Sequence, residues 1–330
     1  MRTIIFTGLL SFLIMGCKPD SKKTIGSVER LDVALDNIIS TDAQIEILAE
    51  GFVWSEGPVW VEAESMLLFS DVPKNTIYKW TEDKGAEVYL TPSGFTGTET
   101  TSREPGSNGL LLDTNGRLVL CQHGNRQMAY MNASLSNPKP EYIALADRYD
   151  GKKFNSPNDA AYRGKDLYFT DPPYGLPERE NDPSKEIPFH GVYRATSSGE
   201  VMLVIDSLTR PNGIAFFPDN STFIVANSDP GKAIWYRYSL GENDSIIHSS
   251  IFYDATENTK TESGLPDGLK IDMHGNVFAT GPGGVWIFSS NGKVLGKIKL
   301  PVPTANCALT PDEKTLYITA DKYLLRVKLR

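Results

Sequence analysis

One short pattern occurs six times along this chain and constrains the fold more than any other feature. Each copy is an apolar run of strand-forming residues that ends in a small or polar residue, usually after an acidic or glycine turn. The copies recur every 40 to 56 residues or so, about the length of a four-stranded propeller blade. The sequence therefore predicts an all-β fold, a six-bladed β-propeller with four-stranded blades over residues 46–330. The copies are "SMLLFSD" (65–71), "GRLVLCQ" (116–122), "KDLYFTD" (165–171), "STFIVAN" (221–227), "GNVFATG" (275–281) and "KTLYITA" (314–320).

A polar residue precedes each copy by about 7 to 9 positions, and in four of the six cases Gly follows it directly. A single Asn-Gly pair is usually a turn. Six polar residues in register at the start of equivalent strands indicate instead one shared location. Because the first strand of each blade lines the central channel, we expect these side chains to converge at one mouth of the channel. They are Glu56, Asn108, Asn158, Asn212, Asp267 and Asn306.

This ring of side chains contains carboxylates and amides but no thiolate or imidazole. An all-oxygen site of this kind suits Ca²⁺, with Mg²⁺ or Mn²⁺ as less comfortable alternatives. Zn²⁺ is the least favoured ion, because no two of the four histidines lie at ligand spacing. The sequence thus predicts a central divalent-cation site. A ring that only holds ordered water and plugs the channel is the alternative.

Two long polar segments are expected beside the ring. If the ring residue begins the first strand at one mouth, the second strand returns to that mouth, and the segment after it lies there too. This argument places His123, Asp171 and the insert 171–191 on the ring face, together with residues 91–109. Loops of this length often cover a site, although tolerated insertions are the alternative.

The N-terminus predicts export. Residues 1–17, "MRTIIFTGLLSFLIMGC", combine one Arg, a short apolar run and a final Gly-Cys, which is typical of a signal peptide. The "IMGC" tetrapeptide resembles a bacterial lipobox, which implies a lipid on Cys17 as the only membrane attachment. We therefore expect a lipoprotein of the bacterial cell envelope, in the periplasm or on the outer surface. A plain secretory signal is the alternative.

Three further features limit the organisation and partners of the chain. Residues 18–45 are polar and mixed in charge, as in a tether and approach segment. Cys121 and Cys307 could form a disulfide in the envelope or remain two buried thiols. The net charge of -8 and the lack of any basic run argue against nucleic acid and favour a small molecule as the partner.

Several motifs resemble the gluconolactonase family, which includes senescence marker protein-30, regucalcin and related lactonases. The resemblance covers roughly residue 50 to the C-terminus, and "NSPND" followed by "FTDPPYG" is particularly close to the bacterial gluconolactonase branch. It implies a six-bladed propeller with one catalytic divalent cation. The other motifs are "EGPVW", "LLFSDVP", "SNGLLLD", "CQHGNR", "RPNGIAFFPD" and "LPDGLKID".

The resemblance also implies the metal ligands. They fall on Glu56, Asn212 and Asp267, which are the Glu of "EGPVW", the Asn of "PNG" and the Asp of "PDG". Asn158, in "PND", matches a position that binds the metal in some relatives and the substrate in others.

The remaining implied roles concern catalysis and substrate binding. Asp267 is expected to act as a general base for water or as a direct nucleophile. Asn108 and His123 are candidates for orienting the hydroxyl groups of the substrate. The animal branch carries a substrate-contacting Arg at the position of Ser156, so this chain departs from the family there.

The predicted function is metal-dependent hydrolysis of a sugar lactone, such as a gluconolactone-like aldonolactone, to the free acid. Two alternatives keep the fold. In the first, the same site acts on another lactone, an ester or an organophosphate. In the second, the propeller is a non-enzymatic lipoprotein binding module with a structural cation.

Overall fold

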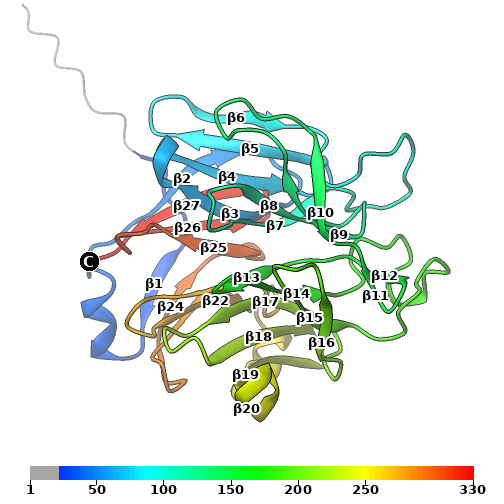
Figure 1. The fold of residues 1–330 in the computed structure, drawn as a ribbon. Coiled ribbons are helices and arrows are strands. Elements are labelled where there is room, and N and C mark those ends of the chain that lie inside the picture. The colour runs from blue at the N-terminus through cyan, green and yellow to red at the C-terminus, as the bar shows by residue number, and fades with distance from the viewer. Residues whose placement is uncertain (1–21) are drawn as a thin grey trace, which may run out of the picture.

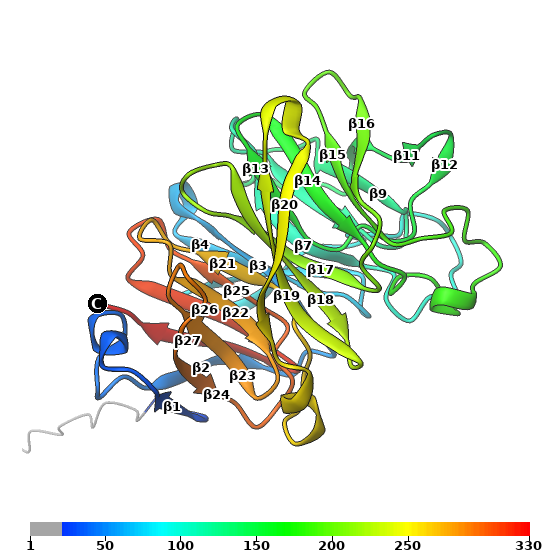
Figure 2. The same cartoon turned by 90° about the horizontal axis from the view of Figure 1, so that it is seen from below.

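In the computed structural model, which describes residues 22–330, six antiparallel sheets surround a central axis (Figures 1 and 2). The first three sheets each use four consecutive strands, with the first strand innermost. Blade 1 contains β3 (Ser55–Val61), β4 (Met66–Asp71), β5 (Thr76–Thr81) and β6 (Gly85–Leu90). Blade 2 contains β7 (Ser107–Leu112), β8 (Leu118–Gln122), β9 (Gln127–Met131) and β10 (Tyr142–Ala146). Blade 3 contains β13 (Ala160–Arg163), β14 (Asp166–Asp171), β15 (Gly191–Ala195) and β16 (Val201–Ile205).

The other three blades complete the circle, and the N-terminal part of the chain closes it. Blade 4 contains β17 (Pro211–Phe216), β18 (Thr222–Asp229), β19 (Lys232–Leu240) and β20 (Ile246–Asp254). Blade 5 contains β21 (Leu269–Ile271), β22 (Val277–Gly281), β23 (Gly284–Phe288), β24 (Val294–Lys299) and, at its rim, β1 (Ser27–Arg30). Blade 6 contains β25 (Asn306–Leu309), β26 (Thr315–Ala320), β27 (Tyr323–Lys328) and β2 (Ile45–Glu50). Because β2 pairs with β27, strands from the two ends of the chain share one sheet.

Short elements occupy the connections. A two-stranded hairpin follows blade 2 and consists of β11 (Arg148–Tyr149) and β12 (Lys152–Lys153). The 3₁₀ helices are η1 (Val33–Asn37), η2 (Glu62–Glu64), η3 (Arg179–Asn181), η4 (Glu242–Asp244) and η5 (Thr256–Lys260). None of the helices in residues 22–330 has the length and apolar character needed to cross a membrane.

The apolar core is divided among the contacts between blades. Six clusters of buried side chains are found, and each joins two neighbouring blades. The second strands β4, β8 and β26 are buried along their whole length because a blade packs on each face of their sheet. This explains why the repeated motif is a continuous apolar run rather than an alternating one. The prediction of a six-bladed, four-stranded propeller is confirmed.

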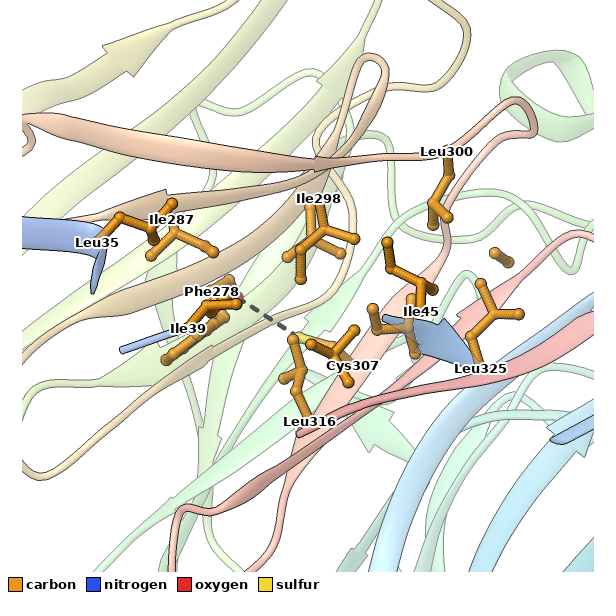
Figure 3. Packing of buried hydrophobic residues seen from close by; sticks show 14 of the residues in the cluster. Leu35, Ile39, Ile45, Phe278, Ile287, Ile298, Leu300, Cys307, Leu316 and Leu325 are labelled. Atoms are coloured by element: carbon orange, nitrogen blue, oxygen red, sulfur yellow. Dashed lines mark hydrogen bonds between the residues drawn. The ribbon is translucent and has the colours of Figure 1, made fainter. Parts of the chain in front are cut away.

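Part of the predicted approach segment packs against the propeller. Strand β1 pairs with β24, and η1 follows it (Figure 2). Leu35 and Ile39 are fully buried between blades 5 and 6, where Figure 3 shows Leu35 beside Ile287 and Ile39 beside Phe278. From β1 onward the segment is therefore part of the folded body, anchored by Leu35 and Ile39, whereas Leu31 and Val33 are exposed. The predicted signal peptide and Cys17 lie outside the described residues.

The two remaining cysteines are buried free thiols. Cys307 contributes to the core between blades 5 and 6, and its Sγ donates to the carbonyl of Phe278 at 3.5 Å (Figure 3). Cys121 lies in the core between blades 2 and 3. Of the two alternatives left by the sequence, the structure therefore contains the thiols and not the disulfide.

Candidate active site

The repeated Asn-Gly pair is a bulge in the innermost strand. In blade 4, Pro211 pairs with Asn227 and the next pair is Ile214 with Val225, so Asn212 and Gly213 together face one residue of β18. A Cβ atom on Gly213 would lie 2.3 Å from the carbonyl oxygen of Asp267 in the next blade. Glycine is thus required because the backbones of neighbouring ring residues touch there.

Polar residues at the ends of the second strands hold the chain that enters the ring. In three blades, the last polar residue of the apolar motif accepts a hydrogen bond from the backbone N–H two residues before the ring residue. The pairs are Asp71 with Trp54 (3.2 Å), Asp171 with Ser156 (2.7 Å) and Asn227 with Arg210 (2.9 Å). The polar end of each of these motifs therefore positions a ring side chain.

Hydroxyl groups of the second strands link one blade to the next. Ser70 Oγ of blade 1 donates to the carbonyl of Asn108 in blade 2 at 2.9 Å. Thr170 Oγ1 of blade 3 donates to the carbonyl of Asn212 in blade 4 at 2.7 Å. These buried hydrogen bonds fix the backbones of ring residues relative to one another.

Five of the six predicted ring residues meet in one cavity of about 350 Å³ at a mouth of the channel, a size at the lower end of the range for small-molecule sites. All but the partly exposed Asp267 are almost completely buried. The convergence predicted from the repeat is thereby confirmed for these five residues. They are Glu56, Asn108, Asn158, Asn212 and Asp267.

Asn306, the sixth predicted member, does not line this cavity. Its Nδ2 approaches Asp159 Oδ2 at 3.4 Å, and its Oδ1 accepts the N–H of Cys307 at 2.9 Å. Both polar groups of the amide are therefore used within the protein.

The ring offers free oxygen atoms. In the part of the chain that the structure describes, four buried side-chain oxygens of the ring lack a hydrogen-bond partner. No group of three or more His, Cys, Asp or Glu side chains suited to a metal occurs in these residues, so a cation site here depends on the amides. Unpaired carboxylate and amide oxygens are the donors that a hard divalent cation takes. The residues present therefore fit such an ion. The four atoms are Oδ1 of Asn108, Asn158, Asn212 and Asp267.

The carboxyl groups of the site raise one another's pKa. Burial, and after it the charge of Asp159, raises the pKa of Glu56 to about 8. The pKa of Asp267 is raised well above its usual range by burial, and then by the charges of Glu56 and Asp159. Asp159 itself is buried beneath the ring, and burial raises its pKa as well. A bound cation would offset this repulsion and favour the ionised forms.

His123 is fully buried, and it lies next to Asn158 rather than among the residues that line the cavity. Its Nε2 is 3.4 Å from Asn158 Nδ2. If that amide nitrogen donates to the imidazole, Asn158 Oδ1 is turned toward the ring, which agrees with the unpaired state of this oxygen. Burial lowers the pKa of His123 to about 3, so the imidazole is neutral and can accept this hydrogen bond. A direct contact between His123 and substrate stays a prediction.

Ser156, at the position of the animal-branch Arg, has a structural contact instead. Its hydroxyl donates to the carbonyl of Pro172 at 2.6 Å and accepts the N–H of Gly175 at 2.9 Å. Ser156 is fully buried and fastens the start of the long insert to the ring.

Both long segments reach the cavity, as the strand argument predicted. They project from the end of the propeller that lies away from the C-terminus (Figure 1). Glu104, from the segment 91–109, and Tyr174 and Arg179, from the insert, form part of the wall. Sequence reasoning placed the segments but named none of these three residues, because only the fold shows which side chains turn inward. Asp159 had a signal, since it occupies the position where four of the other five blades carry Gly.

Comparison with known proteins agrees with this architecture. Residues 54–322 match the family described as "SMP-30/Gluconolactonase/LRE-like region". The chain belongs to this family. The resemblance drawn from the motifs is thereby confirmed.

Individual relatives support the same assignment. A gluconolactonase of Zymomonas mobilis is 36% identical over 314 residues, which cover 93% of this chain and 87% of that protein. The structure of a gluconolactonase from Xanthomonas campestris aligns with a TM-score of 0.79 at 30% identity, covering 95% of this chain and 99% of the other. A calcium-binding regucalcin from Agrobacterium tumefaciens aligns with a TM-score of 0.66 at 15% identity, covering 86% and 93%, and shows the fold alone.

Proposed function

We propose that this family member hydrolyses a sugar lactone of the gluconolactone type to the free acid, with the help of one divalent cation. The observation that carries the proposal is the cavity in which Glu56 and Asp267 meet three amide side chains with unpaired oxygens. A gluconolactonase relative aligned over 93% of the chain supports lactone hydrolysis as the reaction.

The cation would be held by oxygens of Glu56, Asn158, Asn212 and Asp267, and Ca²⁺ suits this set best. When bound, a divalent cation supplies a Lewis acid that polarises the lactone carbonyl. The two carboxylates match the charge of such an ion. Thr170 holds the backbone of Asn212 in place, and His123 contacts the side-chain amide of Asn158.

Asp267 is the residue proposed to act on the reacting atoms. Its Oδ1 is unpaired and faces the cavity with the other ring oxygens. It removes a proton from the attacking water or attacks the carbonyl carbon itself. In the first route, water adds to the carbonyl carbon, the bond to the ring oxygen breaks, and the proton taken up by Asp267 passes to that oxygen, which becomes the alcohol of the open acid. In the second route, the ring opens to an anhydride between the acyl group and Asp267, the ring oxygen takes a proton from solvent, and water then hydrolyses the anhydride to the acid and the free carboxylate. Asn108 would orient a substrate hydroxyl, and the unpaired state of its Oδ1 supports this role.

The test is the release of protons from D-glucono-1,5-lactone by protein that begins after Cys17. Hydrolysis is measured before and after EDTA, and then with Ca²⁺, Mg²⁺, Mn²⁺ or Zn²⁺ added back. We expect EDTA to abolish turnover and Ca²⁺ to restore it. Folded protein that hydrolyses no lactone with any ion would contradict the proposal and favour a binding module.

The Asp267→Asn variant tests the assignment of the catalytic residue. Asparagine keeps the size and one oxygen of the side chain but cannot accept the proton of water, so we expect a folded protein with at least about a thousandfold lower kcat. Circular dichroism checks the fold. Full activity in this variant would remove Asp267 from the mechanism.

We also propose a lipid on Cys17 and a location in the cell envelope. The support is the N-terminal sequence, in which a short apolar run ends in "IMGC". Mass spectrometry of protein extracted from membranes should find an acylated N-terminus at Cys17. A soluble mature protein without lipid would contradict this assignment.

A further inference from the structure

Glu104 is a carboxylate in the cavity wall to which the reaction gives no task. It lines the same cavity as Glu56 and Asp267. Its side chain is 26% exposed, whereas Glu56 and Asn158 are almost fully buried. Glu104 therefore lies between the ring and the solvent, on the path that a ligand of the ring occupies.

The carboxylate of Glu104 is free to accept hydrogen bonds. No donor of residues 22–330 makes a hydrogen bond to it, and the nearest charged or titratable nitrogen, His123 Nδ1, is 3.7 Å from Oε2. Burial raises the pKa of Glu104 to about 7, and the positive charge of Arg179 opposes this rise. Because no protein group donates to the two carboxylate oxygens, they must accept hydrogen bonds from water or from a ligand in the cavity.

The backbone around Glu104 is fixed, so this acceptor is positioned in advance. The N–H of Glu104 donates to Ser102 Oγ at 3.1 Å, and the same hydroxyl donates to the carbonyl of Gly175 in the insert at 2.7 Å. On the other side, the N–H of Gly106 donates to the carbonyl of Val72 at 2.9 Å. The hydroxyl of Ser102 thereby joins the two long segments, two residues before Glu104.

The donors that a sugar lactone offers are its hydroxyl groups, and a carboxylate can accept hydrogen bonds from two adjacent hydroxyls. A lactone whose ring carries only alkyl groups would displace water from the carboxylate without donating a hydrogen bond to it. Such a lactone would therefore bind less favourably. We propose that Glu104 is a specificity-determining residue that binds ring hydroxyls and selects polyhydroxylated lactones over alkyl lactones. This inference rests on the proposed function and names the substrate class of the same site.

The test compares Glu104→Met with Glu99→Met in the full propeller. Methionine keeps the length of the side chain and removes the acceptors. Glu99 is an exposed carboxylate of the same segment that does not line the cavity, and it serves as the matched control. Titration calorimetry measures the Kd of D-glucono-1,5-lactam, a ligand that is not turned over, and kinetics with D-glucono-1,5-lactone give kcat and KM.

We expect the lactam Kd and the KM of Glu104→Met to rise about tenfold to a hundredfold, as for the loss of hydrogen bonds to a charged group. The kcat should stay within about twofold of the wild type. The Kd of the cation should change less than the Kd of the lactam, because the charge of Glu104 acts on Glu56 and Asp267 without a hydrogen bond to either. Glu99→Met should match the wild type throughout.

Three results would overturn the role of Glu104 alone. The first is a Glu104→Met variant that binds the lactam as tightly as a wild type shown to bind it. The second is a variant whose kcat falls while its Kd for the lactam is preserved. The third is a variant in which the Kd of the cation rises more than the Kd of the lactam. The second result would make Glu104 a catalytic acid or base, and the third a metal ligand. A folded wild type that neither binds the lactam nor hydrolyses the lactone would overturn the proposed function together with this inference.

Discussion

Replacing Gly213 by Ala tests whether the contact between blades positions the catalytic residue. The new Cβ would lie 2.3 Å from the carbonyl oxygen of Asp267, so the two strands must separate by about 1 Å to reach the ordinary contact distance of 3.4 Å. Overpacking of this kind costs about 1–3 kcal/mol of unfolding free energy. A displacement of about 1 Å in a catalytic group can lower the rate about a hundredfold. We therefore expect a folded variant with a lower melting temperature and a kcat/KM reduced by about two orders of magnitude.

Gly231→Ala in the same blade is the matched control. Its Cβ would meet only Asp229 Oδ1, at an ordinary 3.5 Å, and its backbone lies outside the left-handed region. Calorimetry and lactone hydrolysis are measured for both variants. If Gly213→Ala keeps the activity and melting temperature of Gly231→Ala, the glycine is not required by the neighbouring blade, and the explanation of the repeated Asn-Gly pair is wrong.

Two further predictions concern side chains that hold the ring in place. Thr170→Val keeps the shape of the side chain but removes the hydroxyl that donates to the carbonyl of Asn212. Urea unfolding should therefore show a free energy of unfolding that is lower by about 1–3 kcal/mol. An unchanged midpoint would contradict the role of this hydroxyl. His123 titrates at its usual pKa of 6.5 in the unfolded chain but at about 3 in the folded protein. The unfolded state therefore binds more protons between these values, and His123 makes the protein less stable as the pH falls below 6.5, by up to about 1.4 kcal/mol per pH unit. The free energy of unfolding is measured for the wild type and for His123→Gln from pH 7 to 4.5. As the pH falls, the wild type should lose more stability than the variant. A difference between the two that does not depend on pH would show that the imidazole is not held neutral.

Much of the site was predictable because a propeller repeats its geometry. The apolar motif recurs once in each blade, so equivalent positions in the sequence become equivalent positions around one axis. Glu56, Asn108 and Asn212 needed no more than this register to be placed at one mouth. The glycine after each of them was visible in the sequence, but its reason, the backbone of the next blade, was not.

Other parts of the site depart from the repeat, so register alone does not predict what their side chains do. Asp159 stands where four of the other five blades carry Gly, and it adds a buried carboxylate to the charges that act on Glu56 and Asp267. Asn306 holds the expected position, yet its amide is used by Asp159 instead of the cavity. Glu104 and Tyr174 come from segments of irregular structure, where periodicity does not say which side chains face inward.

The sequence by itself determined the all-β class, the number of blades, the ring of polar residues and the segments that lie beside it. These features follow from patterns that repeat along the chain. Each blade needs an apolar run in its second strand, because that strand is buried between two neighbouring blades. Tertiary structure alone decided which oxygens are free, which residue holds the amide of Asn158, and which side chains of the long segments enter the cavity. Those choices depend on contacts between residues far apart in the chain, such as Ser102 with Gly175, and no local pattern encodes them.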